Sequence, residues 1–546
     1  MFTSLDWGVL ALYLAGTTWL AARLAGRQQT IRDFFLGGRQ LPWWAVCGSI
    51  VSSEVSGVTF VGVPAIAYAR GGDYRYLMLA FGAIAARLVV GYLLVPAYYR
   101  QEIYSPYEFI GNRLGPGALR LATALFLAGG MLAQGARLFL AGLVLDAITG
   151  IGIPACVLLV GAVSVAWTWI GGIASVVWTD AIQFVLLFGG AVGTLAAVAW
   201  TIGGWDALVE AGTRMGKFRL WDFTLDRRTE FTFWCGLLGT SFLNLGALGT
   251  DQMMAQRLFC CRDARDARKA ILASNVSLLL PVILLTAGVG LAAYFEARPM
   301  TAEHAALVAR RSDYVLPVFF LEAMPAGVRG LLFATIFAAA TATSTLSAMA
   351  QAAHAAFAPR RDAGKEGGVL VSRLLVVAAA VPLCAVAIAC ERIEQYRDIL
   401  RLALWMAAYT YGAVLGMLLL ALLPARRDAR GLPWAVGYSV LLILALNWQH
   451  LDAARALIVA CAALLALSGA WAFRRSPERL GVSLLGAALV ALVAFGRPHL
   501  PGDTGGHLKI VYPWHYPVGT AVTLAFGFLL GDRKTPPGAG SINMVS

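Results

Sequence analysis

Most of the sequence consists of apolar runs of about 20 residues, separated by shorter polar segments. A helix of about 20 apolar residues can cross the hydrocarbon core of a bilayer, so each run predicts a transmembrane helix. If neither 454–473 nor 480–496 crosses, thirteen spans remain and the orientation of the two termini is unchanged. Fifteen such runs lie at residues 7–25, 43–69, 77–98, 118–148, 152–172, 175–203, 232–256, 269–293, 328–357, 369–390, 398–423, 432–448, 454–473, 480–496 and 513–531.

The composition also indicates a membrane protein. Hydrophobic residues make up 59% of the chain and charged residues only 13%, whereas soluble domains carry about 25% charged residues. The net charge of +13 does not indicate nucleic-acid binding, because the basic residues form short clusters between the apolar runs. We therefore predict an all-α, polytopic membrane protein in a lipid bilayer.

The basic residues predict an orientation as well. They are concentrated in alternate short loops, and loops of this kind face the cytoplasm. The pattern places the N-terminus outside and the C-terminus inside the cell, with the protein in the cytoplasmic (inner) membrane. It assigns Arg257 to an inside loop, and it leaves Arg87 and Arg137 within apolar runs.

Two of the apolar runs are interrupted by small and polar residues. The 43–69 run contains serines, glycines, Pro64 and a carboxylate, Glu54, and the 232–256 run contains four glycines around Asn244. Glycine-interrupted segments in corresponding positions of two halves are typical of transporters with inverted repeats, whose broken helices line a substrate or ion site. Close packing of unbroken helices through small residues is the alternative interpretation.

A third segment, residues 341–351 ("TATSTLSAMAQ"), is rich in side-chain oxygens. Thr341 precedes Ser344 and Thr345 by three and four residues, so its carbonyl shares a helix face with both hydroxyls. A hard cation requires several oxygens at close range, and a broken helix opposite would add bare carbonyls. These groups predict a sodium site, although Ser and Thr in a membrane helix can also bond to their own backbone.

Five motifs occur in order along the chain: "DFFLGGRQLPWWAV", "IYSPYEFIGNRLG", "WIGGIASVVWTDAIQFVLLFGG", "GTDQMMAQRLFCCRDARDARKA" and "TSTLSAMAQ". Together they resemble the sodium:solute symporter family, which includes transporters of sugars, proline, vitamins, monocarboxylates and iodide. The resemblance covers roughly residues 7–423. It implies a core of ten helices in two inverted five-helix repeats, with two discontinuous helices.

The same resemblance implies a division of the chain into five parts. A leading transmembrane helix and a cytoplasmic loop occupy 1–42, and the first repeat follows at 43–203. An external loop at 204–231 separates it from the second repeat at 232–423. Additional transmembrane helices and a short cytoplasmic tail make up 424–546.

The resemblance also implies a sodium site between the first and eighth core helices. Asp180 would line the path by which the ion enters and leaves; the alternative is a carboxylate at a helix start, where the helix dipole favours it. Carried over by motif, the sodium ligands are the carbonyls of Ser52, Val55 and Thr341 and the hydroxyls of Ser344 and Thr345.

A carboxylate near the bilayer midplane is costly and usually has a partner, so Glu54 predicts a nearby arginine. A structural ion pair with either Arg87 or Arg137 would leave the other guanidinium able to bind a substrate carboxylate bidentately. We assign Arg137 to the substrate and Arg87 to the ion pair. Glu54, Thr59 and Asn244 complete the predicted substrate site.

The resemblance argues against one class of solute. Sodium-coupled galactose transporters of the family place a glutamate in the second core helix and a glutamine in the tenth. The matching position in the second helix is Ala80, and the tenth, "LALWMAAYTYGAVLG", contains no glutamine. An anionic organic solute is therefore favoured over a hexose, although Asn244 matches one polar position of a sugar site.

The predicted function is sodium-coupled symport of a small, carboxylate-bearing organic solute by alternating access. The alternatives are symport of a sugar, polyol or other neutral solute, and proton-coupled transport with Glu54 or Asp180 as the proton carrier. An enzyme is not expected, because the six histidines show no metal-ligand spacing. The expected partners are the solute, Na+ and the lipid bilayer, without nucleic acid.

Overall fold

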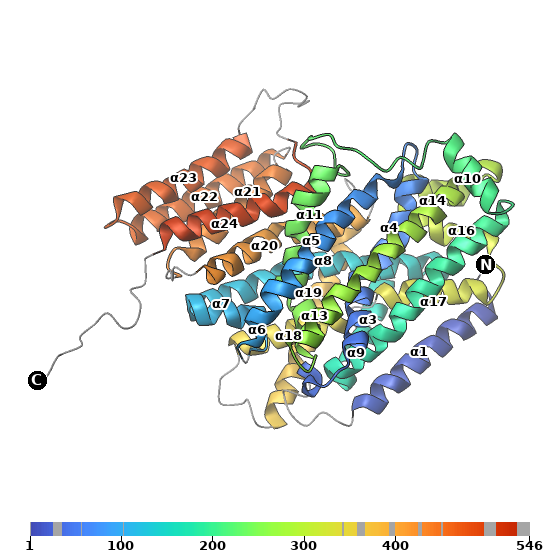
Figure 1. The fold of residues 1–546 in the computed structure, drawn as a ribbon, viewed down its shortest axis with the longest axis horizontal. Coiled ribbons are helices and arrows are strands. Elements are labelled where there is room, and N and C mark those ends of the chain that lie inside the picture. The colour runs from blue at the N-terminus through green and yellow to red at the C-terminus, as the bar shows by residue number, and fades with distance from the viewer. Residues whose placement is uncertain are drawn as a thin grey trace, which may run out of the picture.

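The computed structural model shows a molecule built from helices (Figure 1). Within the residues it describes, extended pairing is limited to one bridge between Leu41 and Cys261. Each of the fifteen predicted runs is mostly helical where the structure describes it, which confirms the all-α membrane fold. The described residues are 2–25, 35–55, 57–101, 103–340, 343–357, 366–392, 399–423, 429–448, 451–495 and 509–531.

Within the described residues, eight helical segments are individually long and apolar enough to cross a bilayer. The two helices whose crossing was least certain from the sequence, Asp452–Ala472 and Pro477–Phe495, are among them. The bent pair Trp43–Glu54 and Gly57–Tyr68 would make a ninth span. The other six are Tyr74–Tyr99, Pro116–Asp146, Ile173–Thr201, Ala264–Ala297, Leu370–Cys390 and Leu402–Leu422.

The first part of the chain contains one unexpectedly long helix. The predicted runs 152–172 and 175–203 both belong to α9, which has 49 residues. The helices of this part are α1 (Ser4–Ala25), α3 (Trp43–Glu54), α4 (Gly57–Tyr68), α5 (Ala80–Val89), α6 (Val95–Tyr99), α7 (Pro106–Leu114), α8 (Pro116–Thr149), α9 (Ile153–Thr201) and α10 (Trp205–Arg214), with short helices η1 (Gly37–Arg39), η2 (Tyr74–Leu79) and η3 (Val90–Leu94).

The second part is more finely divided, because several of its predicted runs consist of shorter helices in series. Its elements are η4 (Cys235–Gly239), α11 (Thr240–Leu245), η5 (Gly246–Thr250), α12 (Gln252–Phe259), α13 (Ala264–Ala273), η6 (Ser274–Leu278), α14 (Leu279–Ala297), α15 (Ala302–Arg310), η7 (Ser312–Tyr314), α16 (Val315–Ala323), α17 (Val328–Ala340), α18 (Thr343–Phe357), α19 (Glu366–Cys390) and α20 (Ile399–Leu422).

The C-terminal helices form a group beside the rest of the molecule, at the left of Figure 1. Here α24 packs along α20, because glycines allow the two helices to approach closely. A Cβ atom added to Gly412 would lie 2.9 Å from the carbonyl oxygen of Tyr516. The helices of this group are α21 (Leu432–Trp448), α22 (Asp452–Ala472), α23 (Pro477–Phe495), η9 (Tyr512–Trp514) and α24 (His515–Leu530).

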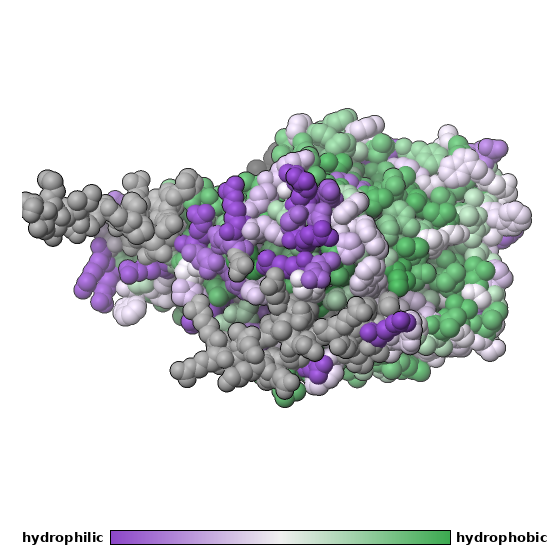
Figure 2. All heavy atoms as spheres, turned by 60° about the horizontal axis from the view of Figure 1, so that its bottom comes forward, coloured by the Kyte–Doolittle hydropathy of each residue, from purple (hydrophilic) through white to green (hydrophobic). Residues whose placement is uncertain are grey.

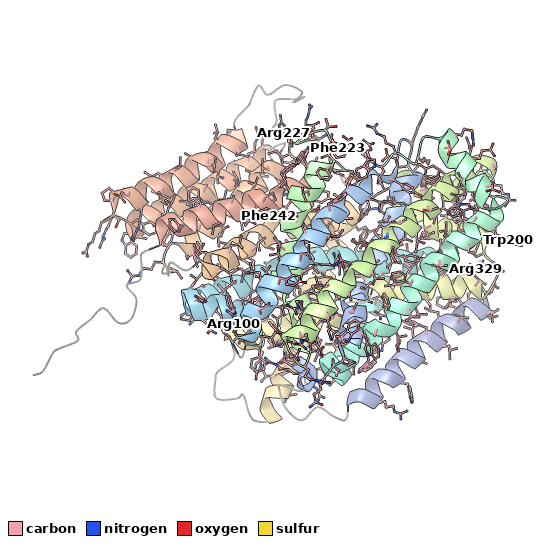
Figure 3. All side chains as sticks on the ribbon, in the orientation of Figure 1. Arg100, Trp200, Phe223, Arg227, Phe242 and Arg329 are labelled. Carbon is pink, nitrogen blue, oxygen red and sulfur yellow. The ribbon has the colours of Figure 1, made fainter. Side chains whose placement is uncertain are left out.

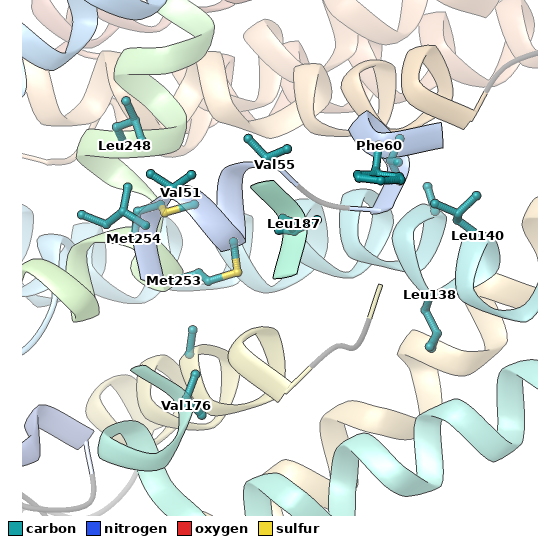
Figure 4. Close-up of a cluster of buried hydrophobic side chains, with 14 of the residues drawn as sticks. Val51, Val55, Phe60, Leu138, Leu140, Val176, Leu187, Leu248, Met253 and Met254 are labelled. Carbon is teal, nitrogen blue, oxygen red and sulfur yellow. The ribbon is translucent and has the colours of Figure 1, made fainter. Parts of the chain in front are cut away.

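The predicted break in the 43–69 run is present. The first helix ends at Glu54, and Val55 leaves the helical conformation with φ −85° and ψ 78°. The axes of α3 and α4 differ by 55°. Figure 4 shows Val55 at the end of α3 and Phe60 on the helix beyond the break, among other buried hydrophobic side chains. Because the last carbonyls of a helix have no intrahelical partner, the end of α3 can offer oxygens to a ligand.

The 232–256 run is interrupted in a different place from the one predicted. The helix continues through Asn244, with wider π-helical turns at η4 and η5 on either side of α11. The chain leaves the helix at Asp251, where ψ is 126°, and α12 begins at the next residue. Four glycines therefore widen the helix rather than end it, and Asp251 marks its end.

The two ends of the helices differ in the loops that they carry. In Figure 3, Arg227 and Phe223 lie at the top of the molecule and Arg100 lies near the bottom. When the bottom is turned forward, Figure 2 shows hydrophilic side chains gathered on that face, with extensive hydrophobic surface beside them. We call the end that carries residues 215–234 the loop end; α11 and α20 both run away from it.

Candidate functional site

A cavity of about 220 Å³ lies beside the break between α3 and α4. Its walls come from both sides of that break, from α5, α8, α11, η5 and α20, and from Tyr512. All four residues predicted to bind substrate line it, namely Glu54, Thr59, Arg137 and Asn244. The structure therefore brings together residues that are separated by as much as 190 positions in the sequence.

Glu54 is paired with Arg87 through a short contact between Nη2 and Oε2. Arg87 is fully buried and also donates to the hydroxyls of Ser274 at 3.0 Å and Ser277 at 2.9 Å, and to the carbonyl of Ala83 at 3.1 Å. Ser277 in turn donates to Glu54 at 3.1 Å. This network occupies four of the five N–H donors of Arg87, as expected for a structural ion pair, and Arg87 is not among the residues that line the cavity.

Arg137 is placed differently, although it is also within a membrane helix. It lines the cavity from α8 and donates from Nη1 to the carbonyl oxygen of Ser53 at 3.0 Å. This carbonyl belongs to the last turn of α3, so Arg137 satisfies a backbone group that the helix break sets free. Within the described residues no carboxylate forms an ion pair with Arg137.

Several neutral polar groups share the cavity wall with Arg137. Asn244 donates its amide to the carbonyl of Thr240 at 2.9 Å, which leaves its side-chain oxygen for another donor. Thr59 and Gln134 also line the cavity, and neither side chain has a hydrogen-bonding partner among the described residues. Gln134 is only 7% exposed. Sequence reasoning missed Gln134, although its position one helical turn before Arg137 places both on one face of α8.

Asp251 is a second group in the cavity wall that sequence reasoning missed. Its carboxylate caps α12 by accepting from the backbone N–H of Met253 at 2.7 Å, and it accepts a short hydrogen bond from the Tyr411 hydroxyl. Both Asp251 and Tyr411 line the cavity. An aspartate directly before an apolar helix is a recognisable N-cap signal, so the sequence alone could have located it.

The described residues predicted to bind sodium lie close to the same helix break. Ser52 is buried and donates to the side chain of Gln183 at 3.3 Å, and Val55 is the residue at which α3 ends. Ser344 donates to Asp180 at 3.3 Å, whereas Thr345 donates to the sulfur of Met253 at 3.7 Å. The fifth predicted ligand, Thr341, lies outside the described residues.

The carboxylate of Asp180, on α9, contacts three other helices. One of its oxygens, Oδ2, accepts from Ser49 at 2.8 Å and from Ser53 at 3.4 Å, both on α3, and from Ser344 on α18. The same oxygen is 2.8 Å from Nη2 of Arg257 on α12. The carboxylate thus connects the broken helix to the oxygen-rich helix, as a residue beside an ion site would.

The assignment of Arg257 to a cytoplasmic loop is wrong. Its side chain is fully buried. In addition to its contact with Asp180, it donates hydrogen bonds to the Ser49 hydroxyl, at 2.8 Å, and to the carbonyl of Met253. The sequence did not show this because Arg257 follows an apolar run, where a basic residue usually marks the cytoplasmic boundary. Its partner lies 77 positions away in the sequence.

Two interrupted membrane helices around a cavity with a few polar groups are typical of one class of protein, the secondary transporters. The sequence profile of the sodium:solute symporter family matches residues 34–437. The chain belongs to this family, which is a family of transporters and not of enzymes.

Curated relatives agree with this assignment. The chain is 30% identical over 364 residues to the sodium/iodide cotransporter of Homo sapiens, a match that covers 64% of this chain and 55% of that protein. It is 27% identical over 352 residues to the sodium/sialic acid symporter SiaT of Proteus mirabilis (strain HI4320), covering 63% and 69% respectively. For the sodium-coupled monocarboxylate transporter 2 of Bos taurus the identity is 29% over 328 residues, covering 59% and 52%. The matched region is thus about half of the first and third of these proteins.

A solved structure shares the fold. It is the substrate-bound, outward-open state of a Na+-coupled sialic acid symporter, with a TM-score of 0.71 and 23% sequence identity. The superposition covers 90% of this chain and 97% of the other. At this level of identity the similarity establishes the fold and leaves the substrate to be inferred from the site.

Proposed function

We propose that the protein couples the movement of Na+ to the uptake of a small organic acid across the cytoplasmic membrane, by alternating access. The observation that carries this proposal is Arg137. Arg137 is half-buried within a membrane helix, lines the cavity and contacts no carboxylate of the described residues. Such a charge is costly unless a ligand supplies the anion. The carboxylate of the solute would provide that partner, in the bidentate geometry that suits a guanidinium.

The sodium ion is the second substrate of this mechanism. We assign it to the carbonyls of Ser52, Val55 and Thr341 and the hydroxyls of Ser344 and Thr345. Support comes from the end of α3, whose last carbonyls are available for a cation. The three relatives described above are sodium-coupled by name. Asp180, in contact with both α3 and α18, would line the path of the ion.

The contact between Arg137 and Ser53 suggests how the two substrates are coupled. Ser53 lies between Ser52 and Val55 in the last turn of α3, so the group that binds the acid also holds the turn that binds the cation. A carboxylate that orients Arg137 toward this carbonyl would stabilise the ion-binding shape of the turn. Coupling of this kind is a free energy shared between two sites, so sodium must strengthen acid binding by the same factor.

The proton-coupled alternative is less well supported. Its two carriers, Glu54 and Asp180, are each bonded to a buried arginine, Arg87 and Arg257. A proton carrier must release its counter-charge once in every cycle, so proton coupling would require one of these ion pairs to break repeatedly. A neutral solute such as a sugar is also disfavoured, because it would leave Arg137 without a counter-charge.

The membrane and the topology belong to the same proposal. The N-terminus would lie outside, the C-terminus in the cytoplasm and the loop end outside the cell. The two five-helix repeats would occupy 43–203 and 232–423, separated by 204–231. The separation of Arg100 from Arg227 and Phe223 across the molecule supports this arrangement (Figure 3).

The experiment is a thermal-stability assay on the purified full chain, in sodium and in potassium, against monocarboxylates, sialic acid, pantothenate, sugars and amino acids. A ligand that binds only the folded state must raise the melting temperature. We expect an acid to do so only in sodium, and Arg137→Ala to abolish the shift. Arg120→Ala, at an exposed position, is the control for loss of a positive charge.

The cation site has its own test in the same assay. Ser344→Ala and Thr345→Ala should raise the sodium concentration needed for the acid-induced shift. If sodium has no effect for any ligand, or if these variants respond to it as the parent does, the sodium site is wrong. Uptake into proteoliposomes that follows a pH gradient without sodium would then favour proton coupling.

A further inference from the structure

Two tyrosine side chains near the loop end of the cavity have hydroxyls without a hydrogen-bonding partner among the described residues. Tyr76 of η2 and Tyr512 of η9 both line the cavity. Neither hydroxyl forms a hydrogen bond to any described residue. A tyrosine hydroxyl in a buried setting normally has a partner, and a solute in the cavity that both residues line could supply one.

Tyr512 is held firmly in this position. The backbone N–H of Val511 donates to the carbonyl of Arg227 at 2.9 Å, and Arg227 donates from Nη1 to the carbonyl of Lys509 at 2.7 Å. On the other side, the Tyr516 hydroxyl donates to the carbonyl of Leu404 at 2.6 Å. These contacts fix the segment between the loop end and α20, and they leave Tyr512 only 1% exposed. The position of Tyr512 is therefore fixed by contacts within the protein.

Tyr512 also comes from an unexpected part of the chain. The family match ends at residue 437, and Tyr512 lies beyond it, in the short helix η9 that precedes α24. It reaches the cavity because α24 packs along α20, with Pro513 against Gly239; a Cβ atom on this glycine would lie 2.9 Å from the Pro513 carbonyl oxygen. The C-terminal helices therefore contribute directly to the cavity wall.

The polar groups of the cavity are arranged along its length. Arg137 lies beside the α3–α4 break, and Gln134 lies one turn away from it on α8. Tyr76 and Tyr512 lie toward the loop end, where Tyr76 also contacts Phe231 with ring centroids 5.5 Å apart. A solute whose carboxylate binds Arg137 would place the rest of its structure against an amide and two hydroxyls.

We propose that the solute is an organic acid with hydroxyl or amide groups along its chain, and that Tyr512 selects for these groups together with Tyr76 and Gln134. This inference rests on the proposed symport of an acid through the same cavity. An aliphatic acid, or a simple inorganic anion, would satisfy Arg137 and leave the three neutral groups desolvated without partners. A site built to hydrogen-bond a substrate discriminates strongly against analogues that lack the matching groups.

The test compares acids of equal charge in sodium-driven uptake by proteoliposomes that contain the full chain. Gluconate, N-acetylneuraminate and pantothenate represent the hydroxylated class, and hexanoate and iodide represent anions without hydroxyl groups. Tyr512→Phe removes only the hydroxyl and should raise KM for the hydroxylated acid about three- to tenfold, the value of one neutral hydrogen bond. Tyr76→Phe is a second probe of the same kind.

Tyr438→Phe is the matched control. Its hydroxyl is buried in the C-terminal helices, 2.8 Å from the Ser483 hydroxyl and away from the cavity, so it should leave KM unchanged. Uptake of a hydroxylated acid that both cavity variants weaken supports the proposal. If hexanoate or iodide is carried as well as the hydroxylated acids, or if both cavity variants behave as the parent, the proposal is overturned while sodium symport stands. If no anion is carried in a sodium-dependent way, both are wrong.

Discussion

Arg87 and Arg137 are both arginines within membrane helices beside the same helix break, yet their surroundings differ. Arg87 is fully buried and bonded to Glu54, two serine hydroxyls and a backbone carbonyl. Among the described residues, Arg137 forms one hydrogen bond, to the carbonyl of Ser53, and it lines the cavity. The first site is complete without a ligand, whereas the second leaves a guanidinium in the cavity wall for the anion that we propose.

This difference shows that a buried charge is best interpreted from its partners. A charge whose partners are all supplied by the protein contributes to a unique structure, and its removal should mainly affect stability. A charge that lines a cavity and forms no ion pair with the described residues should mainly affect binding. The predictions below separate stability from binding at each site.

The largest effect is expected for Arg87→Ala. It leaves the Glu54 carboxylate without its counter-charge inside the protein, which should lower the free energy of unfolding by about 3–5 kcal/mol. The measurement is thermal unfolding in detergent in the absence of ligand. Where the variant retains its fold, the sodium-dependent acid shift should persist, because Arg87 does not line the cavity.

The control for this variant is the double substitution Arg87→Met with Glu54→Gln. It removes both charges, so no uncompensated charge remains, and most of the lost stability should return. A double variant as unstable as Arg87→Ala would show that the ion pair is not the cause of the loss. The comparison between the two arginines would then lose its basis.

Asp180→Asn should have the next largest effect. The amide keeps an oxygen for Arg257 and for the serines, but the buried Arg257 guanidinium loses its counter-charge. A loss of about 1.5–3 kcal/mol of unfolding free energy is expected. Because Ser344 also contacts Asp180, the sodium concentration for half-maximal stabilisation should rise as well.

Stability and sodium response are measured in the same thermal assay. Asp226→Asn is the control, since Asp226 pairs with Arg228 in the partly exposed loop end and an ion pair in such a setting contributes little. A change in stability with no change in sodium response would assign Asp180 a structural role alone. Asp180 would then resemble Arg87, a charged group whose role is to stabilise the fold.

The sequence predicted much of this arrangement because hydropathy and motif spacing are local properties. The apolar runs located the helices, and the glycines and serines of 43–69 located the break near Glu54. The residues chosen for the substrate all line one cavity. Membrane helices must satisfy their backbone internally, which is why interruptions such as this one can be recognised in the sequence.

The remainder depends on contacts between distant segments. Nothing local distinguishes Arg257 from a loop arginine, and only packing brings it to Asp180, 77 positions away. Tyr512 reaches the cavity only because α24 packs along α20. The region around Asn244 shows a different limit of prediction from sequence. A break in the helix was expected there, but the glycines on either side of Asn244 lie in wider π-helical turns and the helix continues. Small residues permit several backbone arrangements, and tertiary packing selects among them.

Arg137→Lys tests the open site with a smaller change. Lysine keeps the positive charge but cannot form two parallel hydrogen bonds to a carboxylate. We expect the affinity for the acid to fall by about 10- to 100-fold, which corresponds to about 1.4–2.8 kcal/mol. Melting without ligand should stay close to that of the parent, in contrast with Arg87→Ala. A variant that loses stability but keeps its affinity would reverse the roles of the two arginines.

Asn244→Ala should have the smallest effect. The side-chain amide is bonded to Thr240, so the ligand would use only the remaining oxygen. Losing one neutral hydrogen bond should weaken acid binding by about three- to tenfold. Thr213→Ala, whose exposed hydroxyl bonds to its own helix, is the control for loss of a polar side chain. If Asn244→Ala abolishes binding as completely as Arg137→Ala, the amide and not the guanidinium defines the substrate. A neutral solute would then fit the cavity better than an acid.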